Sequence, residues 1–274
     1  MTTADSYWEQ IWDELSCPGT WANSNNAKSL TVSDTMEQVN VICMKWGTKY
    51  GPEYVNTLYS MVRRHLTRPF RFVCLTDDDR GFVDGIESFP LIDLDIPNGP
   101  ERGWDKLTTF SSPLYDLQGQ ALFVDLDVVI VDNIDCFFDH EAQFPIIKDW
   151  VKKDVTGNSS VYRFTVNNHP DILEYFRNNH EEVRQQVRNE QEYLSWYVSS
   201  HYDLSYWPDN WCRSFKYHCN HRGVKSWFQP PAKPDDAKII VFHGNPNPPD
   251  AIAGRSGKWY RKVLPTPWVE EHWN

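Results

Sequence analysis

The chain has 274 residues, of which 40% are hydrophobic and 24% are charged. These proportions are typical of a soluble globular protein, and the length suffices for one large α/β domain or two small ones. The formal net charge is −11, so the chain should repel nucleic acid and anionic membranes unless its basic residues are segregated. We therefore expect no nucleic-acid partner.

The sequence carries no strong targeting signal. No apolar run approaches the roughly 18 residues of a membrane-spanning helix, and the acidic N-terminus lacks the apolar core of a secretory leader. The six cysteines are dispersed, as expected for reduced thiols in the cytoplasm. Cys212, His218, Cys219 and His221 match no common zinc-finger spacing, so zinc is a minor alternative. The predicted location is the cytoplasm, with peripheral attachment to the inner membrane face as an alternative.

Hydrophobic periodicity predicts alternating elements in the first part of the chain. Residues 5–15 have helical spacing, and residues 16–37 are typical of a polar connecting loop. A buried strand is expected at 39–44, followed by an amphipathic helix at 55–66 and a second strand at 70–76. This strand–helix–strand order predicts a βαβ unit and a parallel sheet.

The rest of the chain continues the alternation. The expected elements are a helix near 105–117, strands at 121–132, 144–148 and 160–165, helical stretches over 171–199, and a strand at 238–244. We predict an α/β fold with a mostly parallel central sheet flanked by helices. This single domain would cover residues 38–274, preceded by the helix and loop of residues 1–37.

Two aspartates interrupt the apolar stretch ALFVDLDVVIVD at 121–132. Residues two apart in a strand point to the same face, so Asp125 and Asp127 should project together. Neighbouring ionised carboxylates in apolar surroundings repel each other, and a divalent cation relieves that repulsion. Because open α/β sheets bind ligands where parallel strands end, we favour a Mg²⁺ or Mn²⁺ site. The simpler alternative is an exposed turn with two solvated acids.

A phosphatase of the haloacid dehalogenase type is a second alternative, because it also carries Asp-x-Asp after an apolar strand. In those enzymes Gly-Thr usually follows the motif, and a downstream Gly-Asp-x-x-x-Asp completes the metal site. Here Val128 and Val129 follow, and no such downstream motif is present. The phosphatase hypothesis is weakened accordingly.

The segment WDKLTTFSSPLYDLQGQALFVDLDVVIVDNIDCFF, at 104–138, resembles the sugar-nucleotide transferases of the GT-A fold. It is most similar to family 8, the retaining glycosyltransferases that include lipopolysaccharide galactosyl- and glucosyltransferases and glycogenin. Three further motifs follow in family order: NSSVYRF at 158–164, Glu190-Gln191-Glu192 before Leu194, and VFHG at 241–244. The resemblance implies a Rossmann-like GT-A domain that uses a nucleotide-sugar donor.

The resemblance implies a metal site made of Asp125, Asp127 and His243. The imidazole ligand would favour Mn²⁺ over Mg²⁺. A bound dication would stabilise the leaving diphosphate and orient the donor. Without the resemblance, His243 would more simply be a core or loop histidine at the end of a strand.

The resemblance also implies a site for a UDP-linked sugar donor and a separate site for a saccharide acceptor. The implied donor-binding residues are Lys45, Trp46, Gly47, Tyr50, Asp77, Lys106, Leu126, Asn158 and Gly244. Tyr50 stands where the family stacks an aromatic ring on uracil. Aromatic residues at 207–211 and 268–273 are acceptor candidates, although core packing is an equal alternative for them.

Three residues are implied in catalysis. Gln191 corresponds to the family residue nearest the reacting face of the sugar, and its uncharged amide is a poor nucleophile. This favours a same-face mechanism in which the leaving phosphate deprotonates the acceptor, while double displacement through Glu190 or Glu192 stays open. Lys106 would neutralise phosphate or bond the sugar; its alternative is a helix-surface lysine.

Two features depart from the family pattern. The late loop HGNPNPPD, at 243–250, lacks the lysine that holds the diphosphate in the family, and Lys258, Arg255 and Arg102 are candidates to replace it. Glutamate replaces aspartate on both sides of Gln191. The expected function is a metal-dependent hexosyltransferase acting with retention on a saccharide or other hydroxyl acceptor. A catalytically silent nucleotide-sugar-binding domain is the remaining alternative.

Overall fold

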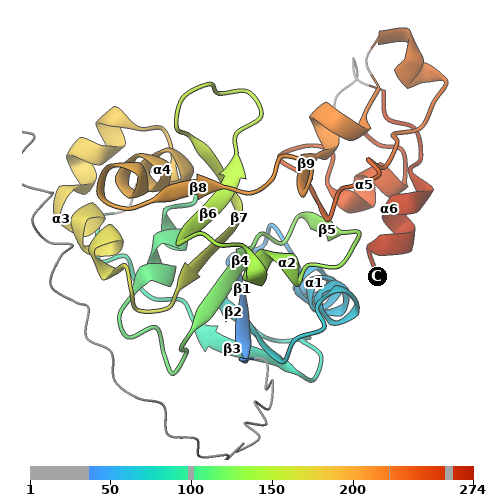
Figure 1. Ribbon diagram of the computed structural model, residues 1–274. Helices are drawn as coiled ribbons and strands as arrows, with labels where there is room; N and C mark the ends of the chain where they lie inside the picture. The colour runs from blue at the N-terminus through green and yellow to red at the C-terminus, as the bar shows by residue number, and fades with distance from the viewer. Residues whose placement is uncertain (1–36, 98–101, 222, 257–261) are drawn as a thin grey trace, which may run out of the picture. The chain divides into compact units, whose positions relative to one another are not determined.

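The structure is a computed structural model that describes residues 37–97, 102–221, 223–256 and 262–274 (Figure 1). The described residues belong to one compact unit, Met36–Asn274. The expected N-terminal helix at 5–15 lies outside the described residues. Within the described ranges, none of the helices combines the length and apolar composition needed to cross a bilayer.

A seven-stranded sheet forms the centre of the fold, with the order β3-β2-β1-β4-β7-β6-β8. Its strands are β1 (Val39–Lys45), β2 (Phe70–Thr76), β3 (Ile86–Pro90), β4 (Gln120–Val124), β6 (Phe144–Lys148), β7 (Gly157–Thr165) and β8 (Leu204–Tyr206). All neighbouring pairs are parallel except those of β7, which runs antiparallel to β4 and β6. The predicted mostly parallel sheet is confirmed.

A second, three-stranded sheet has the order β5-β10-β9, formed by β5 (Val128–Ile130), β10 (Ile239–Val241) and β9 (Cys212–Ser214). The expectation of one strand over 121–132 is therefore wrong. β4 ends at Val124 in the large sheet, and β5 begins at Val128 and pairs antiparallel with β10 of the small sheet. Asp125 and Asp127 lie in the short connection between the two sheets.

The helices are α1 (Pro52–His65), α2 (Cys136–Asp139), α3 (Pro170–Gln186), α4 (Glu190–His201), α5 (Pro248–Ile252) and α6 (Pro267–His272), with short helices η1 (Trp104–Phe110), η2 (Phe215–Cys219) and η3 (Gly223–Trp227). One face of the large sheet packs against α1 and the other against η1, α3 and α4, whereas α6 contacts α5 and β5 of the small sheet (Figure 1). The expected helix near 105–117 is thus a shorter 3₁₀ turn, η1. The expected helical stretch over 171–199 is two helices, and Asn189 caps the second by accepting a hydrogen bond from the Glu192 amide at 3.2 Å.

The core consists of two clusters, one on each face of the large sheet. Alternation along β1 separates them, because Val41 and Cys43 belong to one cluster and Ile42 and Met44 to the other. The first cluster includes the buried side of α1 and the small sheet, and the second includes η1, α3 and α4. The βαβ unit expected from residues 39–76 is confirmed, since β1 and β2 pair in parallel across α1.

Candidate active site

A pocket of about 460 Å³ lies at the carboxyl ends of β1 and β4. Its described lining is Met44, Trp46, Gly47, Thr48, Lys49, Tyr50, Gly103, Lys106, Asp125, Leu126 and Asp127. Three segments that are distant in the sequence therefore meet here: the loop after β1, the start of η1, and the connection between β4 and β5. Ligands of open α/β folds bind at this position relative to the sheet.

Asp125 forms an ion pair at the pocket wall. Lys106 Nζ lies 2.6 Å from Asp125 Oδ1, and the Lys106 side chain is only 12% exposed. Burial acts to lower the pKa of Lys106, but the carboxylates of Asp125 and Glu190 outweigh it and raise that pKa. Lys106 is therefore a protonated, buried cation. It does not lie on a helix surface, which was its alternative interpretation.

Asp127 is held by the hydroxyl of Tyr50, which donates to Asp127 Oδ2 at 2.8 Å. Burial and the negative charge of Asp125 raise the pKa of Asp127 to about 6. Burial and the Asp127 carboxylate also raise the pKa of Tyr50, so its hydroxyl stays protonated as a donor. The Tyr50 ring lies 4.6 Å from Lys49 Nζ and 4.6 Å from the Tyr54 ring centre.

Glu190 is the first residue of α4 and is 3% exposed. Its Oε2 accepts a hydrogen bond from Ser159 Oγ at 2.7 Å, whereas Oε1 has no hydrogen-bond partner among the described residues. Burial raises the pKa of Glu190 to about 7, against the opposing effect of Lys106. A Cβ atom added to Gly103 would lie 3.7 Å from Glu190 Oε2, so this carboxyl sits directly behind the pocket lining.

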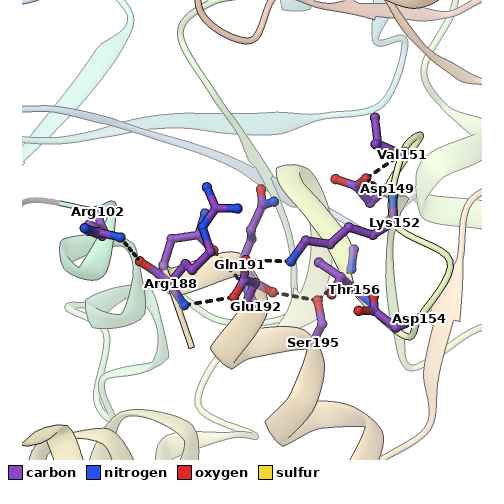
Figure 2. Close-up of polar contacts among 12 residues, drawn as sticks. Arg102, Asp149, Val151, Lys152, Asp154, Thr156, Arg188, Gln191, Glu192 and Ser195 are labelled. Atoms are coloured by element: carbon purple, nitrogen blue, oxygen red, sulfur yellow. Dashed lines mark hydrogen bonds and ion pairs between the residues drawn. The ribbon is translucent and has the colours of Figure 1, made fainter. Parts of the chain in front are cut away.

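Gln191 and Glu192, also in the first turn of α4, have different surroundings (Figure 2). Glu192 Oε1 is 2.5 Å from Lys152 Nζ, and its Oε2 accepts from the Arg188 amide at 2.8 Å. Although partial burial opposes the shift, these contacts lower the pKa of Glu192. Gln191 is half-buried and its side chain extends from the helix start. Neither residue lines the pocket.

Three other residues that were predicted to bind the donor form hydrogen bonds within the protein instead of lining the pocket. Lys45 Nζ donates to the Asp78 carbonyl at 3.1 Å, and the Gly47 amide donates to Asp77 Oδ2 at 2.9 Å. These bonds fix the loop after β1 against the end of β2. Asn158 is buried in β7, where its Oδ1 accepts from the Ser160 amide at 3.1 Å. Lys45, Asp77 and Asn158 are therefore outside the pocket lining.

His243 follows Phe242, whose backbone bonds to that of Asp127. The Phe242 amide donates to the Asp127 carbonyl at 3.1 Å. The imidazole Nε2 is 2.6 Å from Ser214 Oγ, and the ring stacks on Trp150 at 5.4 Å with an interplanar angle of 19°. Burial, aided by nearby Lys216, lowers the pKa of His243. Gly244 follows with φ of 80°, a backbone conformation that favours glycine.

No three side chains from His, Cys, Asp and Glu are grouped to hold a metal ion in the part of the chain that the structure describes. The structure brings Asp125 and Asp127 together but directs the imidazole of His243 toward Ser214. For the alternative zinc set, Cys212 and Cys219 are buried thiols, and His218 Nδ1 accepts from the Ser214 amide at 3.0 Å.

The remaining sequence candidates have structural contacts of their own. Trp207 is buried, and its Nε1 donates to the Val161 carbonyl at 3.1 Å, so it belongs to the core. Trp268 Nε1 donates to the Pro231 carbonyl at 2.9 Å. Of the cations offered in place of the late-loop lysine, Arg102 donates to the Arg188 carbonyl at 2.9 Å. Arg255 pairs with Asp250 at 3.0 Å, and Lys258 lies outside the described residues.

Sequence reasoning missed Lys49 and Gly103, which line the pocket, and Ser159, which bonds Glu190. Lys49 directly precedes Tyr50, so the turn-like stretch KWGTKYGPE could have identified it as a second loop cation. Ser159 follows Asn158 in the motif already singled out. Gly103 carried no signal beyond its place before η1.

The fold resembles those of known glycosyltransferases. The galactosyltransferase LgtC, in complex with donor and acceptor sugar analogues, matches with a TM-score of 0.55 and 10% identity, over 76% of this chain and 88% of LgtC. The glycosyltransferase GlyE of Streptococcus pneumoniae matches with a TM-score of 0.56 and 13% identity, over 84% of this chain. That match spans 60% of the GlyE chain. No family model and no curated protein sequence matches this chain. The predicted GT-A fold class is confirmed.

Proposed function

We propose that this chain is a glycosyltransferase that moves a hexose from a nucleoside diphosphate sugar, UDP-linked, to a saccharide or other hydroxyl acceptor with retention. One observation carries the proposal: Asp125 and Asp127 share the wall of a pocket at the carboxyl ends of β1 and β4. The similarity of the fold to LgtC and GlyE supports the reaction class. The same similarity disfavours the phosphatase alternative.

The two aspartates fit a divalent cation. Burial and repulsion by Asp125 raise the pKa of Asp127 to about 6, and a bound dication would relieve that repulsion. His243 does not fit in its present orientation, because its Nε2 is engaged with Ser214. We therefore propose Asp125 and Asp127 as the protein ligands of Mn²⁺ or Mg²⁺, with His243 joining them only after leaving Ser214. When bound, the metal supplies Lewis-acid stabilisation of the leaving diphosphate.

The protein's own groups are placed to receive the donor. Lys106 contributes a fixed positive charge beside Asp125, where the diphosphate of the donor would lie. Glu190 lies behind the pocket lining, where its carboxyl supports the positive charge of Lys106. Both groups are held before the substrate arrives, which reduces the reorganisation needed during the reaction.

The surroundings of α4 favour the same-face mechanism. Glu192 is tied to Lys152 and to the Arg188 amide, and Gln191 has only an amide to offer. Attack by Glu192 on the sugar would require breaking its ion pair. We therefore propose that the leaving phosphate takes the proton of the acceptor hydroxyl as that hydroxyl bonds to the anomeric carbon.

Calorimetric titration of UDP with and without MnCl₂ tests the proposal. We expect metal-enhanced binding in the wild type, and metal-dependent hydrolysis of at least one nucleotide sugar in a donor screen. Asp127→Asn should remove the metal enhancement and slow donor turnover by about a hundredfold or more, because it weakens both the metal site and the Tyr50 contact. The fold should persist, as judged by circular dichroism.

Asp132→Asn is the matched control, because Asp132 is exposed and pairs with Lys238 on the surface. A fully active Asp127→Asn variant would contradict the assignment. Donor binding without hydrolysis or transfer to any acceptor would favour the silent binding domain. Phosphate release from a small phosphomonoester, abolished by the same substitution, would favour the phosphatase.

A further inference from the structure

The acidic and basic side chains that line the pocket balance each other, and this balance affects diphosphate binding. Its described lining carries two carboxylates, Asp125 and Asp127, and two ammonium groups, Lys49 and Lys106. A diphosphate adds further negative charge to this wall, so it needs cations that are available to it. Lys106 is largely committed, because it is buried and lies 2.6 Å from Asp125.

Lys49 is the available cation. It is exposed, and no described carboxylate lies within ion-pairing distance of its ammonium group. Its ammonium group lies 4.6 Å from the centre of the Tyr50 ring. Lys49 is nevertheless near enough to Asp127 to stabilise the charge of that carboxylate. It therefore lies at the open side of the same wall that carries Asp125 and Asp127.

The loop that carries Lys49 is fixed on both sides of it. The Gly47 amide bonds to Asp77 Oδ2 at 2.9 Å, with Gly47 at φ of 61°, and the Tyr50 hydroxyl bonds to Asp127 at 2.8 Å. The backbone position of Lys49 is thus set before any ligand binds. Only the flexible side chain must be ordered on binding, which keeps the entropic cost small.

We propose that Lys49 is a donor-binding residue that contacts the diphosphate of the nucleoside diphosphate sugar and discriminates diphosphates from less charged nucleosides. This inference rests on the proposed function and adds to it the residue that supplies the second positive charge. Lys49 compensates the acidic wall formed by Asp125 and Asp127. Its Nζ donates charge-assisted hydrogen bonds to phosphate oxygens, which are among the stronger polar contacts in proteins.

The test is calorimetric titration of the full chain with UDP, UMP and uridine. Lys49→Gln should weaken UDP binding by about tenfold or more, weaken UMP binding less, and leave uridine binding unchanged. Lys49→Arg should retain most of the UDP affinity, because it keeps the charge. The UDP affinity of the wild type should also fall more steeply with added NaCl than that of Lys49→Gln.

Lys153→Gln is the control, since Lys153 is an exposed lysine outside the pocket lining. Equal UDP affinity in the wild type and Lys49→Gln would overturn the inference and leave the proposed function standing. An equal loss for UDP and uridine would also overturn it, because Lys49 would then shape the nucleoside pocket. A wild type that binds none of UDP, GDP, ADP and CDP would overturn the proposed function and this inference together.

Discussion

The side chains around the two aspartates form one charge network in which each acid has a different partner. Asp125 has the ammonium group of Lys106, Asp127 has the hydroxyl of Tyr50, and Glu190 has one oxygen without a described partner. Burial raises the pKa of Asp127 to about 6 and that of Glu190 to about 7. Buried acids with raised pKa values beside a pocket are characteristic of functional sites.

The raised pKa of Glu190 predicts a pH dependence of stability. Its ordinary value is 4.5 and its value in the folded chain is about 7, so the folded state holds the extra proton between these limits. The contribution of Glu190 to the stability of the folded state therefore falls as pH rises from about 4.5 to about 7 and is constant above that. Glu190→Gln removes this titration. Between pH 4.5 and pH 8, the difference in unfolding free energy between Glu190→Gln and the wild type should shift in favour of the variant by up to about 3 kcal/mol.

Urea unfolding of both proteins at pH 4.5, 7 and 8 measures this difference. Asp127 titrates in both proteins, so its contribution cancels to first order in the comparison. Glu182→Gln is a suitable control, because Glu182 is exposed on α3. A stability difference between Glu190→Gln and the wild type that stays constant across the three pH values would contradict the buried, raised-pKa carboxyl.

At the scale of elements, local sequence patterns predicted the helices and strands that are determined by residues close together in the sequence. The helical spacing of Val55, Leu58 and Val62 and the apolar runs on either side were enough for the βαβ unit. The division of the stretch 121–132 was not predictable, because it depends on the pairing of β5 with β10, more than a hundred residues later. Hydrophobicity alone cannot distinguish one long buried strand from two short strands in different sheets.

The candidate site shows the same division between local and distant information. Asp125 and Asp127 both line the pocket, but they lie in the connection between β4 and β5, so strand alternation is not the reason that they are close together. The partners of those acids come from the loop after β1 and from η1, so contacts such as Tyr50 to Asp127 needed the fold. The orientation of His243 depends on Ser214 and Trp150, which no local pattern connects to it.

The strand β7 yields a prediction at the same scale. A Cβ atom added to Gly157 would lie 2.8 Å from Ile146 Cγ2 and 3.0 Å from the Ile147 carbonyl, where the register with β6 shifts. Gly157→Ala should therefore destabilise the chain by about 1–3 kcal/mol, because neighbouring backbone must move. Urea unfolding measures the change, with Ser199→Ala on the exposed side of α4 as the control. Wild-type stability in Gly157→Ala would contradict the close packing of β6 on β7.

At the scale of the whole compact unit, the candidate site lies where two sheets are joined. Asp125 follows β4 of the large sheet, and the Asp127 carbonyl accepts from Phe242 at the end of β10 in the small sheet. The loop after β1 provides a further part of the pocket lining. A ligand held by Asp125, Asp127 and this loop would therefore contact segments that the fold, rather than the chain order, brings together.

This arrangement predicts cooperative stabilisation by the proposed donor and metal. A ligand at a hundred times its dissociation constant stabilises the native state by about 2.7 kcal/mol, which corresponds to a Tm increase of several degrees at this size. UDP together with MnCl₂ should raise Tm by more than the sum of either alone, because the diphosphate and the carboxylates hold the metal jointly. Differential scanning calorimetry measures the shift. In Asp127→Asn the combined effect should vanish, whereas Asp132→Asn should behave as the wild type; additive shifts in the wild type would contradict a shared metal and diphosphate site.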